Sequence, residues 1–235
     1  QQTSTLGLSA NLDQTPPTSA NAATYNKTTK SMAAYAATGT GTPPDAPPME
    51  LSVVDSMGGT HKFALAFEKT ATANTWNAEI YAVPASDVST AGPNGQIAAG
   101  LVKFNTDGSI DLANSTLFGA AGATPQINLA ASGGTQPAWG TALGIAAQPL
   151  SLDLSQFTQL AAATTVNSVT SDGAGVGNIV GVQVGADGVV SALFDNSQVR
   201  KIAKVAIATF PNADGLQSVN GNAYMATLPA GQMTL

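Results

Sequence analysis

The stretch MELSVVDSMGGTHKFALAFEKTATANTWNAEIYAVP, residues 49–84, decides the fold class. Apolar and polar residues alternate in three runs within it, and turn-forming residues separate the runs. In the second run, Phe63, Leu65 and Phe67 share one face, and polar side chains lie at its ends. A period of two is typical of strands that are buried on one side. The stretch therefore predicts a three-stranded antiparallel meander.

The same alternation recurs on both sides of this stretch. Residues 3–13 place Leu6, Leu8 and Leu12 on one face, which predicts a strand just before the meander. Further strands or hairpins are expected at 97–113, 148–157, 178–184, 188–194, 199–209 and 222–227.

Between these strands the sequence is less regular. Residues 14–48 are rich in Pro, Thr, Ala and Asn, and they predict a long irregular excursion with a short helix at SMAAYAA, residues 31–37. Residues 86–147 give no prediction of fold beyond the hairpin around Asp107 and Gly108. No segment has the periodicity of a long amphipathic helix. The predicted class is all-β, with two elongated β-barrel or sandwich-like domains and little helix.

Charge and cysteine content exclude several classes of protein. Charged residues make up 9% of the chain, against roughly 25% in an average soluble domain, and the net charge is −6. The densest basic group, Arg200, Lys201 and Lys204, is too small to neutralise a nucleic-acid backbone or to hold the chain at an anionic membrane. No apolar run approaches the roughly 18 residues of a membrane span. The lack of cysteine excludes disulfides, thiolate metal sites and cysteine nucleophiles.

Few side chains could carry catalysis. His61 is the only histidine, and its strand parity with Phe63 favours a residue at a strand end over a Ser–His–Asp triad or a zinc site. Most aspartates stand in turn positions, where they bond the local backbone, so no facing carboxylate pair is expected for a glycosidase. These aspartates include Asp55, Asp107, Asp172, Asp187 and Asp214.

Two further patterns are weak evidence for a binding site. The loop NTDGSID, residues 105–111, lacks the full acidic spacing of a calcium loop. Trp76 is expected in the core because of its strand parity, whereas Trp139 is expected to be exposed, where it could stack on a sugar. We predict no catalytic, cofactor-binding or metal-binding residue and no cofactor, so surfaces rather than reactive groups should carry the function.

Two segments resemble bacterial flagellar hook proteins. Residues 52–81 resemble the start of the outer domain of that family, in which a V-x-D-S-x-G-x-x-H turn precedes an apolar strand ending in F-x-K-T and then N-x-W. The matching residues are Val53, Asp55, Ser56, Gly58, His61, Phe67, Lys69, Thr70, Asn74 and Trp76. Residues 169–227 resemble a second run that hook and rod proteins share. Its matching residues include Asp172, Gly173, Gly177, Gly181, Gly188, Val190, Ala192, Gln198, Val205, Ala206, Ala208, Phe210, Asn212, Gly215, Leu216, Gly221, Asn222, Tyr224 and Ala226.

The resemblance implies an organisation and a function. Residues 1–167 would form the outer hook domain, and residues 168–235 the inner β domain, which would then be incomplete in this chain. The subunit would polymerise head to tail into a flexible tube, a universal joint that transmits motor torque to the filament. Its partners would be other hook subunits, the hook cap, the rod and the hook–filament junction, with no nucleic acid or membrane, while the fragment alone would be monomeric.

The resemblance also implies a location, an extracellular bacterial hook reached through the flagellar secretion apparatus without a cleaved signal peptide. The chain begins at Gln1 rather than Met, which favours an internal fragment of a longer protein. Two other functions stay open at this point. One is a distal-rod type of axial protein, and the other is an extracellular carbohydrate-binding or adhesive module. The subunit-contact residues cannot be named from the sequence.

Overall fold

The computed structural model describes residues 1–196, 198–206 and 208–234. The contacts divide the chain into two compact units, Gln1–Val176 and Gly177–Leu235. Each unit is described by itself below.

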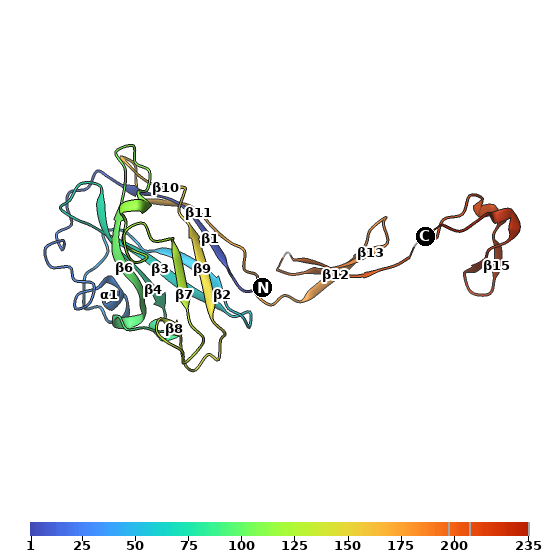
Figure 1. Ribbon diagram of the computed structural model, residues 1–235, viewed down its shortest axis with the longest axis horizontal. Helices are drawn as coiled ribbons and strands as arrows, with labels where there is room; N and C mark the ends of the chain where they lie inside the picture. Colours follow the sequence, from blue (N-terminus) through green and yellow to red (C-terminus); the bar gives the residue numbers. More distant parts are fainter. Residues whose placement is uncertain (197, 207, 235) are drawn as a thin grey trace. The chain divides into compact units, whose positions relative to one another are not determined.

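Two sheets build the first unit (Figure 1). One sheet has the order β10-β1-β9-β7, and its fifth strand, β11, pairs with β1 outside this order. The second sheet has the order β2-β3-β4-β6. The strands of the first sheet are β1 (Thr5–Asp13), β7 (Gln126–Leu129), β9 (Gln148–Asp153), β10 (Phe157–Leu160) and β11 (Thr165–Ser171). Those of the second are β2 (Met49–Val54), β3 (Thr60–Lys69), β4 (Thr75–Val83) and β6 (Gln96–Lys103).

Short elements complete the first unit. The strands β5 (Val88–Ser89) and β8 (Ala138–Trp139) pair with each other. The helical elements are α1 (Met32–Thr38) and the single 3₁₀ turns η1 (Ala85–Asp87), η2 (Pro93–Gly95) and η3 (Leu112–Asn114).

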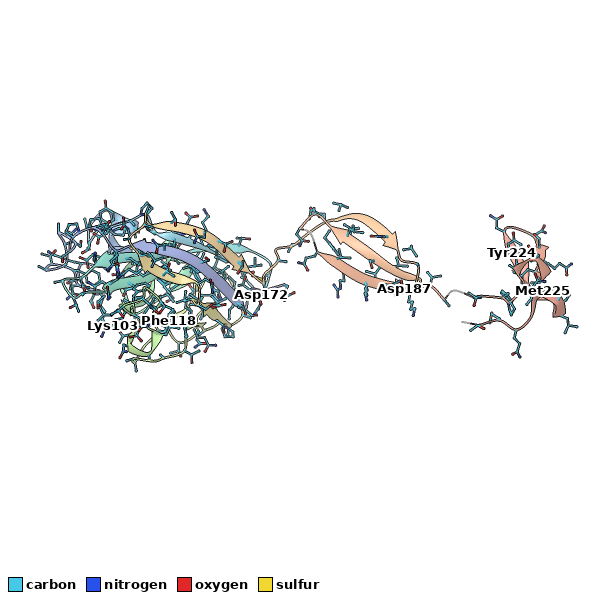
Figure 2. The ribbon with its side chains drawn as sticks, turned by 90° about the horizontal axis from the view of Figure 1, so that it is seen from above. Lys103, Phe118, Asp172, Asp187, Tyr224 and Met225 are labelled. Atoms are coloured by element: carbon cyan, nitrogen blue, oxygen red, sulfur yellow. The ribbon has the colours of Figure 1, made fainter. Side chains whose placement is uncertain are left out.

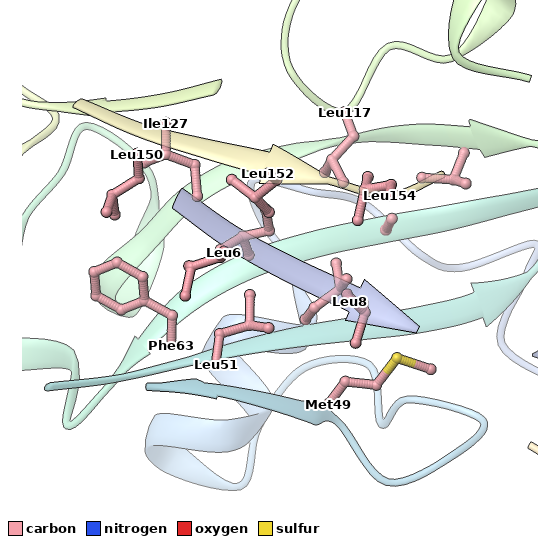
Figure 3. Packing of buried hydrophobic residues seen from close by; sticks show 14 of the residues in the cluster. Leu6, Leu8, Met49, Leu51, Phe63, Leu117, Ile127, Leu150, Leu152 and Leu154 are labelled. Atoms are coloured by element: carbon pink, nitrogen blue, oxygen red, sulfur yellow. The ribbon is translucent and has the colours of Figure 1, made fainter. Parts of the chain in front are cut away.

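The core of the first unit lies between the two sheets (Figure 3). Alternate residues of each strand point into it, as the sequence predicts. Leu6 and Leu8 come from β1, Leu51 and Phe63 from the opposite sheet, and Leu150 from β9, all nearly inaccessible to solvent. Burial of such side chains is the main favourable term in folding, at about 1.5–3 kcal/mol for each large one.

The predicted excursion over residues 14–48 covers the outer face of the second sheet. Its helix α1 places Met32 and Ala33 against Ala64, Ala66 and Tyr81, which form a second small apolar cluster. The helix is short but capped at both ends: the Ser31 hydroxyl accepts a hydrogen bond from Ala34 N, and Gly39 ends the helix with a φ of 74°. The helix expected at residues 31–37 is therefore present.

Several expectations are confirmed and one needs correction. The meander of residues 49–84 is present as β2, β3 and β4 with continuous antiparallel registers. The hairpin predicted for 97–113 is present around Asp107 and Gly108, but its second arm is shorter than predicted. The Phe104–Ile110 bridge and the hydrogen bonds from Asn105 N to Ser109 O and from Asp111 N to Lys103 O continue the pairing, and η3 follows. The approximate domain boundary expected between residues 167 and 168 stays a prediction; the contacts divide the chain a few residues later, after Val176, because β11 pairs with β1.

The second unit consists of a three-stranded antiparallel sheet and a small hairpin. The sheet has the order β12 (Ile179–Val184), β13 (Val189–Phe194) and β14 (Val199–Lys204). The strand predicted for 199–209 thus ends earlier, and residue 207 within that prediction lies outside the described residues. The hairpin joins β15 (Gln217–Val219) to β16 (Ala223–Met225), between the 3₁₀ turns η4 (Ala213–Gly215) and η5 (Leu228–Ala230).

The all-β class is confirmed by these elements. Within the described residues, no helix has the length and apolar character needed to cross a lipid bilayer.

Candidate interaction surface

His61, the one histidine, lies in a buried ionic cluster near the start of β3. Its Nε2 lies 2.9 Å from Oδ2 of Asp55, and its Nδ1 lies 2.7 Å from Oδ2 of Asp87. Burial by itself lowers the pKa of His61, but the hydrogen bonds and charges of Asp87 and Asp55 outweigh it and raise that pKa above its usual value. Because both ring nitrogens bind carboxylates, the cluster links the turn after β2 to η1.

The two carboxylates reach this histidine from different parts of the chain. Asp55 occupies the turn after β2, and its Oδ1 accepts hydrogen bonds from the backbone N–H groups of Met57 and Gly59, as its turn position predicts. Asp87 comes from η1, and no local pattern in the sequence points to its role. Within the described residues, no group of three or more His, Cys, Asp and Glu side chains could hold a metal ion.

The expected exposure of Trp139 is wrong. Its side chain is fully buried, with its ring centroid 4.7 Å from that of His61 and 5.9 Å from that of Phe63. The short pair β5–β8 carries Trp139 under the ionic cluster, a placement that the Gly-rich sequence around it does not reveal. A buried ring cannot stack on a sugar. Trp76 is buried as predicted, and its Nε1 donates a 2.6 Å hydrogen bond to Oε1 of Gln159.

Two buried glutamates lie beneath the 14–48 excursion. Glu79 of β4 accepts hydrogen bonds from the Tyr25 hydroxyl at 2.8 Å and from the backbone N–H groups of Met32 and Ala33 at 2.9 Å each. Burial raises the pKa of Glu68, whose Oε2 accepts a 2.7 Å hydrogen bond from Nδ2 of Asn77. These carboxylates anchor the excursion and offer no open site.

Exposed apolar side chains concentrate in the second unit. Its buried apolar residues, among those described, are Ala192 and Ala230. The sheet and the segment that follows expose large apolar side chains, while the first unit keeps most of its own inside (Figure 2). Those exposed in the second unit are Ile179, Val180, Val182, Val184, Val199, Ile202, Val205, Val219, Tyr224, Met225, Leu228 and Met233.

The strand register places two of these exposed residues, Val182 and Val184, on one face together with Val190 and the buried Ala192. Val182 pairs with Ala192, and Val184 pairs with Val190, so these four apolar side chains share a face. Arg200 and Lys201 lie on the edge strand β14, where charges oppose strand addition. The opposite edge strand β12, with sequence IVGVQV, carries no charge. A single exposed layer with an apolar face is typical of a surface that another element covers.

Comparison with known proteins gives a consistent result. The model of the family described as "Flagellar basal body protein FlaE D2 domain" matches residues 47–174, more than half of the chain. The flagellar hook protein FlgE of Caulobacter vibrioides is 38% identical over 229 residues, which cover 90% of this chain and 38% of that protein. FlgE of Escherichia coli is 30% identical over 184 residues, covering 77% of this chain and 39% of that protein.

A solved structure agrees with these relatives. A 32 kDa fragment of FlgE from Caulobacter crescentus superposes with a TM-score of 0.57 and 32% identity, covering 63% of this chain and 53% of the fragment. The chain thus spans well under half the length of the full hook proteins that it matches.

Proposed function

Since this chain belongs to the flagellar hook protein family, we propose that it is the outer part of a structural subunit that polymerises into the hook. The polymer would be a flexible tube that transmits motor torque to the filament as a universal joint. The observation that carries the proposal is the match of residues 47–174 to the D2 domain model, and all of these residues lie in the first unit.

The two units would have different tasks. The first unit, with its continuous core and ionic cluster, would be the rigid outer domain. The second unit would be part of an inner β domain. Its exposed apolar face would pack against segments of the full-length protein that lie outside this chain, because relatives are much longer than the chain. Burial of that face would supply the core that the three strands lack.

The same proposal implies the binding partners of the subunit and the way in which it is exported. The subunit would contact other copies of itself, and the finished tube would meet the rod, the hook cap and the hook–filament junction. It would be located outside the cell and exported by the flagellar apparatus without a cleaved signal peptide. Catalysis has no part in this function.

The alternatives have less support. The relatives reported above carry the name of a hook protein rather than a rod protein. The carbohydrate-binding alternative depended on an exposed Trp139, which is buried instead.

Electron microscopy tests the proposal directly. An antibody raised against this chain should label short curved tubes of uniform diameter on cells that lack the filament protein. A variant with Val182→Asp in the full-length protein should be secreted without forming tubes. Labelling of straight rods, or of the bare cell surface, would overturn the hook proposal.

A further inference from the structure

A groove lies where the two sheets of the first unit meet along β6 and β7. It measures about 380 Å³, and its walls come from both edge strands and from the segment around Leu117 and Phe118. Leu117 is buried at its base, and Phe118 packs partly against the core. Among the described residues that line the groove, none is charged. The groove is therefore an apolar slot bounded by two strand edges.

The β6 wall presents free backbone groups. Hydrogen-bonded and non-hydrogen-bonded residue pairs alternate along an antiparallel ladder, and the hydrogen bond from Phe104 N to Asn74 O identifies which pairs of β4 and β6 are bonded. The backbone N–H and C=O groups of Ala98 and Gly100 therefore point to β4, whereas those of Ala99 point away from it. Further along the same edge, Leu101 N donates to the Thr116 hydroxyl, and Leu101 O accepts from Thr116 N. The chain itself therefore closes the edge beyond Gly100 and leaves it open at Ala99.

The β7 wall presents free groups of the same kind. The hydrogen bond from Leu152 N to Pro125 O sets the phase of the β7–β9 ladder. Ile127 consequently bonds β9, while the N–H and C=O groups of Gln126 and Asn128 face away from it. All three residues line the groove, with the Ile127 side chain buried.

We propose that this groove binds one extended, uncharged peptide segment, which adds a strand between β6 and β7. Two facing edges with unpaired donors and acceptors suit an extended backbone, and the apolar base suits small or apolar side chains. A helix would leave the edge groups unpaired, and a charged side chain would lose hydration without gaining a partner.

The occupant that fits best is a segment of a second copy of this chain, an assignment that rests on the proposed function. Two largely exposed loops outside the strands, residues 119–125 and 131–136, contain no charged residue, so a neighbouring copy can supply uncharged chain without giving up its own core. A groove that receives a different segment of the next copy makes a heterologous contact. Where the rotation between copies does not close a ring, such contacts generate a helical polymer. The single site would be weak, so the chain would be monomeric at low concentration.

Amide exchange tests the groove in the 235-residue chain. In dilute solution, the amides of Ala99, Gln126 and Asn128 should exchange rapidly, while those of Ala98 and Gly100 should be protected. Peptides copied from the exposed loops 119–125 and 131–136 serve as probes. At least one peptide should slow exchange at the three groove amides by about tenfold, equivalent to about 1.4 kcal/mol.

Matched variants sharpen the test. Gln126→Pro and Ala99→Pro each remove one N–H that faces the groove, and proline is tolerated at such an edge position. Both should abolish peptide binding, whereas Gln126→Ala and Ala99→Ser keep the N–H and should preserve it. Protection of Gly100 reports that each variant is folded.

Two results would overturn the inference: neither loop peptide slows exchange at the groove amides, or the proline variants bind as well as their controls. Either result would leave the hook proposal intact, because antibody labelling of tubes tests that proposal independently.

Discussion

The rings of His61 and Trp139 pack against each other in a tilted arrangement, with centroids 4.7 Å apart and an interplanar angle of 47°. The contact joins the start of the β3 strand to the short strand β8, and Asp55 and Asp87 hold the same imidazole at its two nitrogens. Both ring nitrogens of this buried imidazole have carboxylate partners, and these hydrogen bonds are charge-assisted. The cluster therefore organises one end of the first unit.

Replacing Asp87 with Asn should destabilise the first unit. The variant loses a charge-assisted hydrogen bond to a largely buried partner, so the free energy of unfolding should fall by about 1–3 kcal/mol. Urea unfolding followed by tryptophan fluorescence measures the change. Glu50→Gln is the control, since it removes an exposed pair with Lys62 and should change stability by less than about 0.5 kcal/mol. Equal effects of the two variants would contradict the role given to the cluster.

The cluster also predicts a pH dependence. Because the pKa of His61 is raised in the folded state, its contribution to stability is fully present below the unfolded value near 6.5 and is lost as pH rises through the folded value. The urea midpoint should therefore decline above pH 6.5 in the wild type. His61→Gln should lack this decline, and a decline of equal size in both proteins would place its origin elsewhere.

At low pH, the contribution of Asp55 to stability has the opposite dependence on pH. Hydrogen bonds from His61, Gly59 and Met57 outweigh the effect of burial and lower the pKa of this carboxyl. Its contribution is present above the unfolded value of 3.8 and is lost as pH falls through the lower folded value. In Asp55→Asn, the urea midpoint should therefore decrease less at low pH than it does in the wild type. An equal decrease in both proteins would show that other carboxylates dominate it.

Glu79→Gln should loosen the excursion over residues 14–48. The amide presents one acceptor oxygen where the carboxylate presents two, so at least one of the Tyr25, Met32 and Ala33 donors is left without its partner. The expected cost is about 1–3 kcal/mol. Exchange of the Met32 and Ala33 amides should accelerate before that of β3 and β4. Uniform acceleration across the whole unit would argue against a separately opening segment.

The two units should respond differently to loss of an apolar side chain. Phe63→Ala leaves a cavity in the closed core and should cost about 3–5 kcal/mol. Val182 is 61% exposed, so Val182→Ala should change the stability of this chain by less than about 0.5 kcal/mol. Thermal unfolding of both variants distinguishes the two cases. A large loss for Val182→Ala would show that the sheet already has a covering layer.

The sequence by itself determined most of the strands. Alternation of apolar residues in 49–84 predicted β2, β3 and β4, and it also predicted β1. Successive side chains of a strand point to opposite faces, so a strand with one buried face shows apolar residues at every second position of the sequence. The resemblance to hook proteins likewise depended on local runs, and it agrees with the family match over residues 47–174.

Only the tertiary structure decided which distant residues meet. It brought Asp87 and Trp139 to His61, paired β11 with β1 so that the unit boundary moved to Val176, and left Ala99 and Gln126 facing one groove. Such pairings depend on how one sheet packs on the other and on which strand edges remain unpaired. Local periodicity carries neither kind of information, because it records the burial of a face and not the identity of the neighbour.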